Sequence, residues 1–202
     1  MLTSFLKSIS YLFHPLLMPW MGAVYYFSVT PKDYSRLKIS YWLISIISLS
    51  VLLPLVLYFI LNKLNKVQTI HLKTSKERIW PLLLNSMIIG YLSVYVLPES
   101  ICVELHYFLL GIVITILMGL VLALLKFKTS IHMMSTSSAF IFIVLINLHY
   151  SYSVSSAFVV FVIMMGAMVS SRLHLNAHTA RELVVGLIIG VSPQLLLLKN
   201  WL

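Results

Sequence analysis

Charged residues are scarce in this chain, and acidic residues are the scarcest. Only 9% of the 202 residues are charged, with five Asp and Glu against 14 Lys and Arg, while 60% are hydrophobic. Soluble domains carry roughly 25% charged residues, so the composition excludes an ordinary soluble protein. The single cysteine, Cys102, excludes an internal disulfide. The net charge of +9 does not indicate a nucleic-acid partner, because no soluble basic domain is present; it fits loops beside anionic headgroups or a bound phosphate.

Long apolar runs dominate the rest of the sequence. A helix needs about 20 largely apolar residues to cross the hydrocarbon layer, and continuous runs favour helices over the alternating strands of a barrel. We therefore predict an all-α membrane protein: a polytopic bundle of about six to seven transmembrane helices that forms one domain over residues 1–202. The first run has no cleavage site and is expected to be retained. The apolar segments are Ile9–Val29, Tyr41–Leu61, Leu82–Leu97, Leu105–Leu125, Thr136–Tyr150, Tyr152–Ser170 and Leu183–Leu198.

Some residues inside these segments predict local features. Pro15, which follows His14, and Pro54 are each expected to kink a helix, because proline removes one backbone N–H. Gly186 and Gly190 are spaced for close helix approach, which we expect within the bundle rather than at a dimer interface.

The polar loops are predicted to gather at one face of the membrane. Counting crossings places the N-terminus and the loops at residues 63–81, 126–135 and 171–182 on the same side. These loops contain most of the ionisable residues. We therefore expect them to build a single polar site at the bilayer surface.

The last of these loops has a pattern suited to nucleophilic chemistry. On a helix, His174, His178 and Glu182 would share a face, because they are spaced four residues apart. A carboxylate one turn from an imidazole can accept its N–H, which leaves the other ring nitrogen free to attack. Arg172 adds a planar fork of donors for phosphate oxygens. The same three residues could also ligate a metal, but no H-E-x-x-H pattern or cysteine cluster favours that alternative.

The spacing of this loop resembles a known enzyme signature. Ser171, Arg172, His178 and Glu182 form S-R-x5-H-x3-E. This pattern resembles the third signature of the type 2 phosphatidic acid phosphatase superfamily, in which Asp is usual at the last position. The resemblance covers about residues 70–185.

Two weaker matches precede it in the expected order. Ser130 and His132 keep the spacing of the second signature, P-S-G-H, but its Pro and Gly are replaced. In the first signature, K-x6-R-P, Lys73 matches the lysine, and Trp80 stands where Arg is usual. Arg78 is the expected substitute for that arginine, and Lys76 is a weaker candidate.

The resemblance implies a mechanism that needs neither metal nor cofactor. His178 would attack phosphorus to form a phosphohistidine, Glu182 would orient His178, and His132 would protonate the leaving oxygen and then activate water. The residues implied to stabilise the phosphoryl oxygens are Lys73, Arg78, Arg172, Ser130 and Ser171.

The implied function is dephosphorylation of a lipid phosphate, such as phosphatidic acid, phosphatidylglycerol phosphate or a polyprenyl (pyro)phosphate. The expected partners are this substrate and membrane lipids; the oligomeric state is not predicted. The alternative is a non-catalytic lipid-binding or transport protein that retains a relic phosphate site.

The orientation in the membrane is predicted in opposite directions by two arguments. The resemblance implies a periplasmic or luminal site, and we expect a bacterial inner membrane with the site facing outward. The positive-inside rule points to the cytoplasm, because ten of the 14 basic residues lie on the motif face. These ten are Lys7, Lys63, Lys66, Lys73, Lys76, Arg78, Lys126, Lys128, Arg172 and Arg181.

Overall fold

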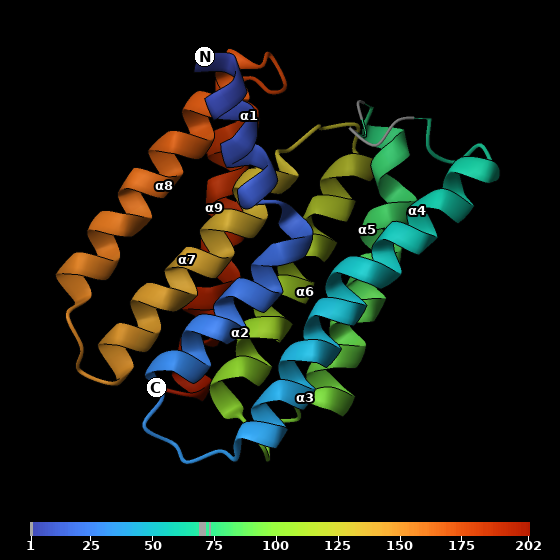
Figure 1. The fold of residues 1–202 in the computed structure, drawn as a ribbon. Coiled ribbons are helices and arrows are strands. Elements are labelled where there is room, and N and C mark those ends of the chain that lie inside the picture. The colour runs from blue at the N-terminus through green and yellow to red at the C-terminus, as the bar shows by residue number, and fades with distance from the viewer. Residues whose placement is uncertain (1, 69–71, 73) are drawn as a thin grey trace.

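The computed structural model describes residues 2–68, 72 and 74–202, and every regular element in that part of the chain is helical (Figure 1). The predicted all-α class is confirmed. The α-helices are α1 (Leu2–Leu12), α2 (Met18–Val29), α3 (Arg36–Ile47), α4 (Leu53–Lys63), α5 (Ser75–Tyr91), α6 (Val103–Leu124), α7 (Ile131–His149), α8 (Val154–His174) and α9 (Ala180–Leu197). Short 3-10 helices, η1 (Pro15–Leu17) and η4 (Leu198–Asn200), and π-helical turns, η2 (Ser48–Leu52) and η3 (Leu92–Val96), complete them.

Six continuous helical stretches are long and apolar enough to cross a membrane, with 19 to 28 residues each. This confirms a membrane-embedded helical bundle. The stretches are Arg36–Lys63, Ser75–Val96, Val103–Leu124, Ile131–His149, Val154–His174 and Ala180–Asn200. In the first of them, the π turn η2 ends just before Pro54, and the helix continues through α4.

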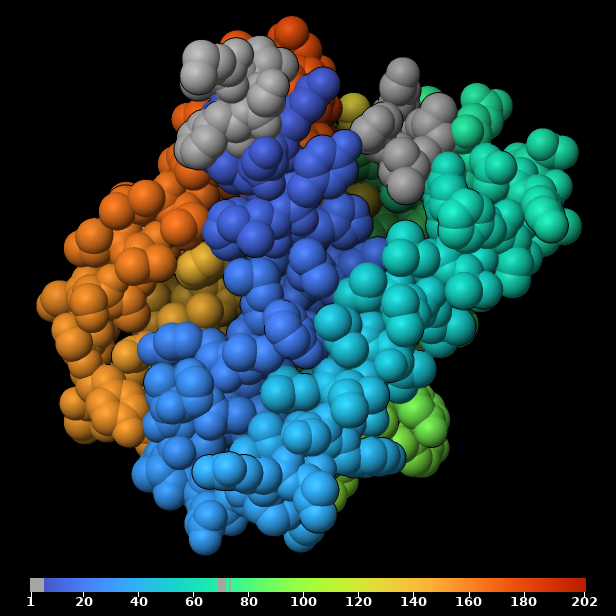
Figure 2. Space-filling view, in the orientation of Figure 1, coloured from blue at the N-terminus to red at the C-terminus, as the bar shows by residue number. Residues whose placement is uncertain are grey.

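The first apolar segment is broken rather than kinked, which corrects the expectation of one span over Ile9–Val29. The break lies between α1 and η1, where His14 adopts an extended backbone with φ −66° and ψ 138°. Proline disfavours the helical conformation of the residue before it, so Pro15 accounts for the break. In Figure 2 the two pieces, α1 and α2, lie between α8 on one side and α3 and α4 on the other.

Three spans that look short in the sequence are extended by their polar first turns. The helices α5, α7 and α9 begin several residues before their apolar runs. The N-cap residues are Thr74 for α5, Ser130 for α7 and Thr179 for α9. The side-chain hydroxyl of each accepts a hydrogen bond from a backbone N–H of the first turn. Arg78, Ser130, His132, His178 and Glu182 therefore lie at or beside helix N-termini, whereas Ser171 and Arg172 lie in the last turn of α8.

The predicted sidedness of the loops is confirmed. The N-terminus and the connections α4–α5, α6–α7 and α8–α9 lie at one end of the bundle in Figure 1. The connections α2–α3, α5–α6 and α7–α8 and the C-terminus lie at the opposite end.

Helix α7 forms the centre of the bundle, and α9 packs tightly against it. A Cβ atom on Gly186 would lie 2.9 Å from the Met133 Cβ and 3.0 Å from the Ser130 carbonyl oxygen. A Cβ atom on Gly190 would collide with the Met134 carbonyl oxygen and the Ser137 hydroxyl. The two glycines therefore serve internal packing, as predicted, and they bring the first turns of α7 and α9 together.

Candidate functional site

The residues of the last polar loop do not share one helix, which corrects the sequence analysis. Helix α8 ends at His174 and α9 begins at Ala180. The new helix starts with a capping box: the Glu182 backbone N–H donates to the Thr179 hydroxyl at 3.4 Å, and the Thr179 backbone N–H donates to the Glu182 carboxylate at 3.2 Å. His174 is exposed at the end of α8, so it is not part of the same array.

The expected contact between His178 and Glu182 is nevertheless present. The folded-back Glu182 carboxylate that completes the capping box also lies 2.6 Å from Nδ1 of His178. The His178 side chain is only 4% exposed. Burial, together with the positive charges of Arg78 and Lys128, lowers the pKa of His178 below its ordinary value, although the bond to Glu182 opposes this shift. The imidazole is therefore neutral at pH 7, with Nδ1–H donated to Glu182 and a lone pair on Nε2.

The start of α7 is docked directly on the start of α9. The Ser130 backbone N–H donates to the Glu182 carbonyl oxygen at 3.2 Å, and the Ser130 hydroxyl caps α7 by accepting the Met133 N–H at 3.4 Å. Ser130 is fully buried. Ser130 thus positions the second and third motifs relative to each other, whereas the prediction from the sequence was a contact with phosphate.

Arg78 and Arg172 are both held by neighbouring loops and helices. Arg78, 4% exposed, donates from Nε to the Leu72 carbonyl oxygen at 3.0 Å and from Nη1 to the carbonyl oxygen of Thr129. Arg172 donates from Nη1 to the Ser10 hydroxyl at 3.2 Å, while its buried Nε has no hydrogen-bond partner within the described part of the chain. A buried donor without a partner is uncommon in folded proteins, so the hydrogen-bonding capacity of the Arg172 guanidinium is not used up by the described residues.

Ser171 faces α1 instead of joining Arg172. Its hydroxyl donates to the Leu6 carbonyl oxygen at 2.7 Å and lies 2.8 Å from the Ser10 hydroxyl. Its role in the structure is to fix α1 to α8, and it does not line the cavity described next.

A cavity of about 790 Å³ brings the remaining motif residues together. His132, Arg172, His178 and Arg78 all line it, so the predicted convergence of three separate loops is confirmed for these residues. Lys73 lies outside the described residues, and the exposed Lys76 does not line the cavity, which favours Arg78 as the substitute.

One end of the cavity carries a large excess of positive charge. Lys7, Arg78, Lys128 and Arg172 line it, and we call these four residues the cationic end. No carboxylate occurs among the lining residues that the structure describes; Glu182 lies behind His178. Burial, together with the positive charges of Arg78 and Arg172, lowers the pKa of Lys128, although Glu182 opposes this shift. Uncompensated cations in a partly buried cleft attract anions.

The other part of the cavity is an apolar arm, which we define by residues of η1, α4 and α5. These residues are Leu16, Pro54, Leu55, Leu57, Leu61, Leu82, Leu84 and Ile88. Tyr11 of α1 lines the cavity too, and its side chain is 68% exposed. Leu55 of the apolar arm is 37% exposed. The surface is recessed between α1 and α4 in Figure 2, so the cavity reaches the side of the bundle between these two helices.

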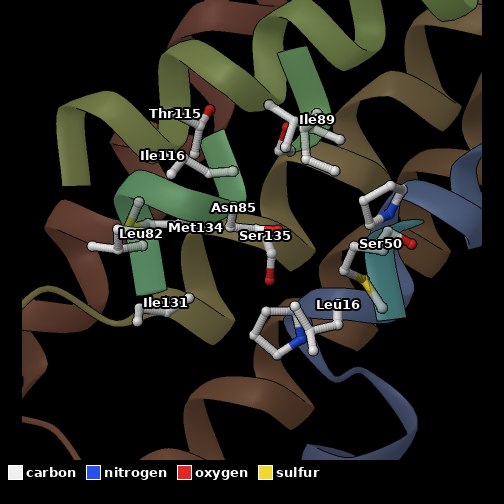
Figure 3. A pocket seen from close by; sticks show the side chains of 15 residues that line it. Leu16, Ser50, Leu82, Asn85, Ile89, Thr115, Ile116, Ile131, Met134 and Ser135 are labelled. Carbon is white, nitrogen blue, oxygen red and sulfur yellow. The ribbon is translucent and has the colours of Figure 1, made fainter. Parts of the chain in front are cut away.

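A smaller cavity of about 40 Å³ extends inward from this arm (Figure 3). Leu16, Leu82 and Asn85 line both cavities. Ser50 Oγ and Asn85 Oδ1 are buried without a hydrogen-bond partner in the described structure. The arm therefore adjoins a small space in which two of the polar atoms are unpartnered.

Helix α1 carries a polar stripe that was not predicted from the sequence. Lys7, Ser10 and Tyr11 of α1, and His14 just beyond it, fall at positions i, i+3, i+4 and i+7, and all line the cavity. This spacing is typical of one face of an amphipathic helix, and it was the available signal. No group of three or more His, Cys, Asp or Glu suited to a metal ion occurs among the residues described.

Comparisons with known proteins add no assignment. No family model matches the chain, and no curated protein or solved structure that was compared with it matches either.

Proposed function

We propose that the chain is an integral-membrane phosphatase that removes phosphate from a lipid phosphate through a phosphohistidine on His178. The observation that carries the proposal is one cavity with two chemically different parts. Its cationic end suits a phosphate group, and its apolar arm suits a hydrocarbon chain entering from the bilayer. The resemblance of three sequence motifs to the type 2 phosphatidic acid phosphatase superfamily supports the same conclusion.

The proposed first step transfers the phosphoryl group to the protein. The Nε2 lone pair of neutral His178 forms a bond to phosphorus while the bond from phosphorus to the ester oxygen breaks. The electron pair of that bond stays on the ester oxygen, which takes a proton from the protonated ring of His132 and leaves as an alcohol; His132 is then neutral. Glu182 stabilises the positive charge that develops on His178, and the cationic end stabilises the equatorial oxygens.

The second step returns the protein to its starting state. Water attacks phosphorus, His132 takes a proton from that water, and the bond between phosphorus and Nε2 breaks. Inorganic phosphate then leaves the cationic end.

Phosphate release tests the proposal against a non-catalytic lipid-binding or transport role. Detergent-solubilised protein should release inorganic phosphate from phosphatidic acid, phosphatidylglycerol phosphate or a polyprenyl phosphate. Saturable binding of all three lipids without phosphate release would favour the non-catalytic role.

We further propose that the cavity faces the periplasm of a bacterial inner membrane. Lys7, Arg78, Lys128 and Arg172 line the cavity, so phosphate binding accounts for part of the basic charge that otherwise favours the cytoplasm. Lys66→Cys, an exposed position at this end, should react with a membrane-impermeant maleimide in spheroplasts, whereas Lys38→Cys at the other end should not. The native Cys102 is buried. The reverse labelling pattern would place the cavity in the cytoplasm.

A further inference from the structure

His14 lies where the cationic end meets the apolar arm. His14 lines the cavity, and so do the next two residues, Pro15 and Leu16. Leu16 belongs to the apolar arm. One helical turn earlier, the Ser10 hydroxyl accepts a hydrogen bond from Arg172. A lipid phosphate with its phosphate at Arg172 and its chain along Leu16 would place the ester oxygen, which joins the two, beside His14.

The break between α1 and η1 determines which ring nitrogen of His14 can donate. The Leu16 backbone N–H donates to Nδ1 of His14 at 3.4 Å. A nitrogen that accepts a hydrogen bond carries no proton, so a neutral His14 has its proton on Nε2. His14 can therefore donate from Nε2 but has no further ring lone pair with which to act as a base.

The ring of His14 also packs edge-on against the ring of His132. Their centroids are 5.6 Å apart and the rings are inclined at 84°. His132 is the proton donor for the leaving oxygen in the proposed function. Two imidazoles from elements far apart in the chain are thus directed to the same part of the cavity.

We propose that His14 is a third catalytic histidine. It donates a hydrogen bond from its Nε2–H to the ester oxygen of the lipid phosphate as that oxygen leaves. This inference rests on the proposed phosphatase function. The bond from phosphorus to the ester oxygen breaks, its electron pair stays on oxygen, and the proton that completes the alcohol comes from His132. His14 keeps its own proton and stabilises the negative charge that develops on the oxygen.

If His14 stabilises the leaving oxygen, the loss of turnover in a His14 variant should depend on the leaving group of the substrate. A purely structural role of His14 predicts the same loss for every substrate. His14→Asn retains a side-chain acceptor for the Leu16 N–H, since Asn is a favoured N-cap residue, but its amide is too short to reach the ester oxygen. Loss of one preorganised donor costs about 10²–10³ in turnover. We expect that loss for a lipid phosphate, whose alkoxide is a poor leaving group. With p-nitrophenyl phosphate, whose phenolate needs little stabilisation, the loss should be less than about threefold.

The experiment compares both substrates in the same detergent for wild type, His14→Asn and His174→Asn. The exposed His174 does not line the cavity, so its variant should hydrolyse both substrates like wild type, and all three proteins should share one thermal midpoint. An equal loss by His14→Asn on both substrates, or no loss on either, would overturn the role of His14 while leaving the phosphatase intact. A wild-type protein that hydrolyses neither substrate would instead overturn the proposed function, and this inference with it.

Discussion

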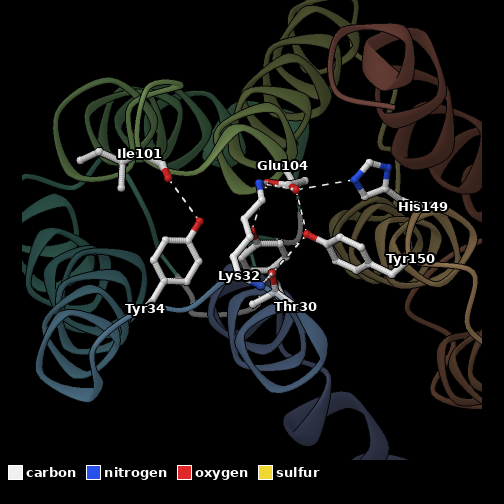
Figure 4. A network of polar contacts seen from close by, with 8 residues as sticks. Thr30, Lys32, Tyr34, Ile101, Glu104, His149 and Tyr150 are labelled. Atoms are coloured by element: carbon white, nitrogen blue, oxygen red, sulfur yellow. Dashed lines mark hydrogen bonds and ion pairs between the residues drawn. The ribbon is translucent and has the colours of Figure 1, made fainter.

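Glu104 on the first turn of α6 is the counterpart of Glu182 on the first turn of α9, at the opposite end of the bundle. Glu104 is 1% exposed and accepts hydrogen bonds from Lys32 at 2.7 and 2.8 Å, from Tyr26 at 3.1 Å and from Tyr150 at 2.8 Å (Figure 4). His149 Nε2 lies 3.7 Å away. We call these five residues the Glu104 cluster, and none of them lines the cavity.

The two ends differ in how their charges are compensated. In the Glu104 cluster one carboxylate faces one ammonium, and hydroxyl donors complete its hydrogen bonding. The cluster joins α2, the α2–α3 connection, α6 and the C-terminal end of α7, and its charges compensate each other. At the cationic end, four cations face a cavity while the nearby carboxylate of Glu182 is bonded to His178 and Thr179. A closed polar cluster stabilises packing; surplus charge beside a cavity indicates a ligand. The same substitution at the two ends should therefore have different consequences.

Removal of the imidazole at each end should give the largest contrast. His178→Ala removes the proposed nucleophile, and we expect turnover of a lipid phosphate to fall by about 10⁴ or more. His149→Ala, the same change in the Glu104 cluster, should leave turnover within about twofold. Phosphate release by purified proteins measures both, with the thermal midpoint of His178→Ala confirming that it is folded. Wild-type turnover by His178→Ala would eliminate the proposed nucleophile.

Neutralising the two carboxylates should separate turnover from stability. Glu182→Gln retains the capping box, because Gln serves at that position, but loses the charge that supports the phosphohistidine; we expect turnover to fall about 10²–10³ with little change in thermal midpoint. Glu104→Gln should retain turnover but lose about 2 kcal/mol of stability, because a charge-assisted bond to Lys32 is lost. If both variants changed only stability, the two carboxylates would have the same structural role.

A third contrast concerns the packing that holds the two motifs together. Gly190→Ala places a methyl group against the Met134 carbonyl oxygen, so α9 must move away from α7. We expect a cost of about 1–3 kcal/mol, with reduced turnover because Ser130 and Glu182 are drawn apart. Gly166→Ala in α8 has nothing within 4 Å of the new Cβ and should be tolerated. Thermal midpoints in detergent distinguish them; equal midpoints would show that the glycine contact is not needed.

The smallest expected effect concerns the pH dependence of kcat/KM. Burial lowers the pKa of His178 in the fold, so the nucleophile stays unprotonated as the pH falls through the ordinary histidine value of about 6.5. We expect the acid limb of kcat/KM to lie below pH 6.5 or so. In Glu182→Gln, which loses the bond that favours the protonated ring, the limb should move lower still. A limb above about 7 would contradict a buried, neutral His178.

The sequence predicted much of the fold because lipid imposes a simple rule on length and hydropathy. It also predicted the bond from Glu182 to His178, although by the wrong geometry: the capping box at Thr179 replaces the continuous helix. The polar spacing along α1 was visible in the sequence, but the cavity that this face lines could not be predicted, because it depends on the break before Pro15 and on tertiary contacts such as that between Ser10 and Arg172. Ser130 and Ser171 were assigned to phosphate by their motifs, but tertiary hydrogen bonds engage both.

The central claim is that His178 carries the phosphoryl group, and transient labelling of the protein tests it most directly. Wild-type protein mixed with a lipid [³²P]phosphate and quenched in alkaline detergent should retain label with the acid lability and alkali stability of a phosphohistidine. His132→Ala, given an aryl [³²P]phosphate whose leaving group needs no proton, should accumulate more label, because the second step lacks its base. His178→Ala should retain none. Label of equal amount in His178→Ala, or turnover without any labelled protein in wild type and His132→Ala, would contradict the account.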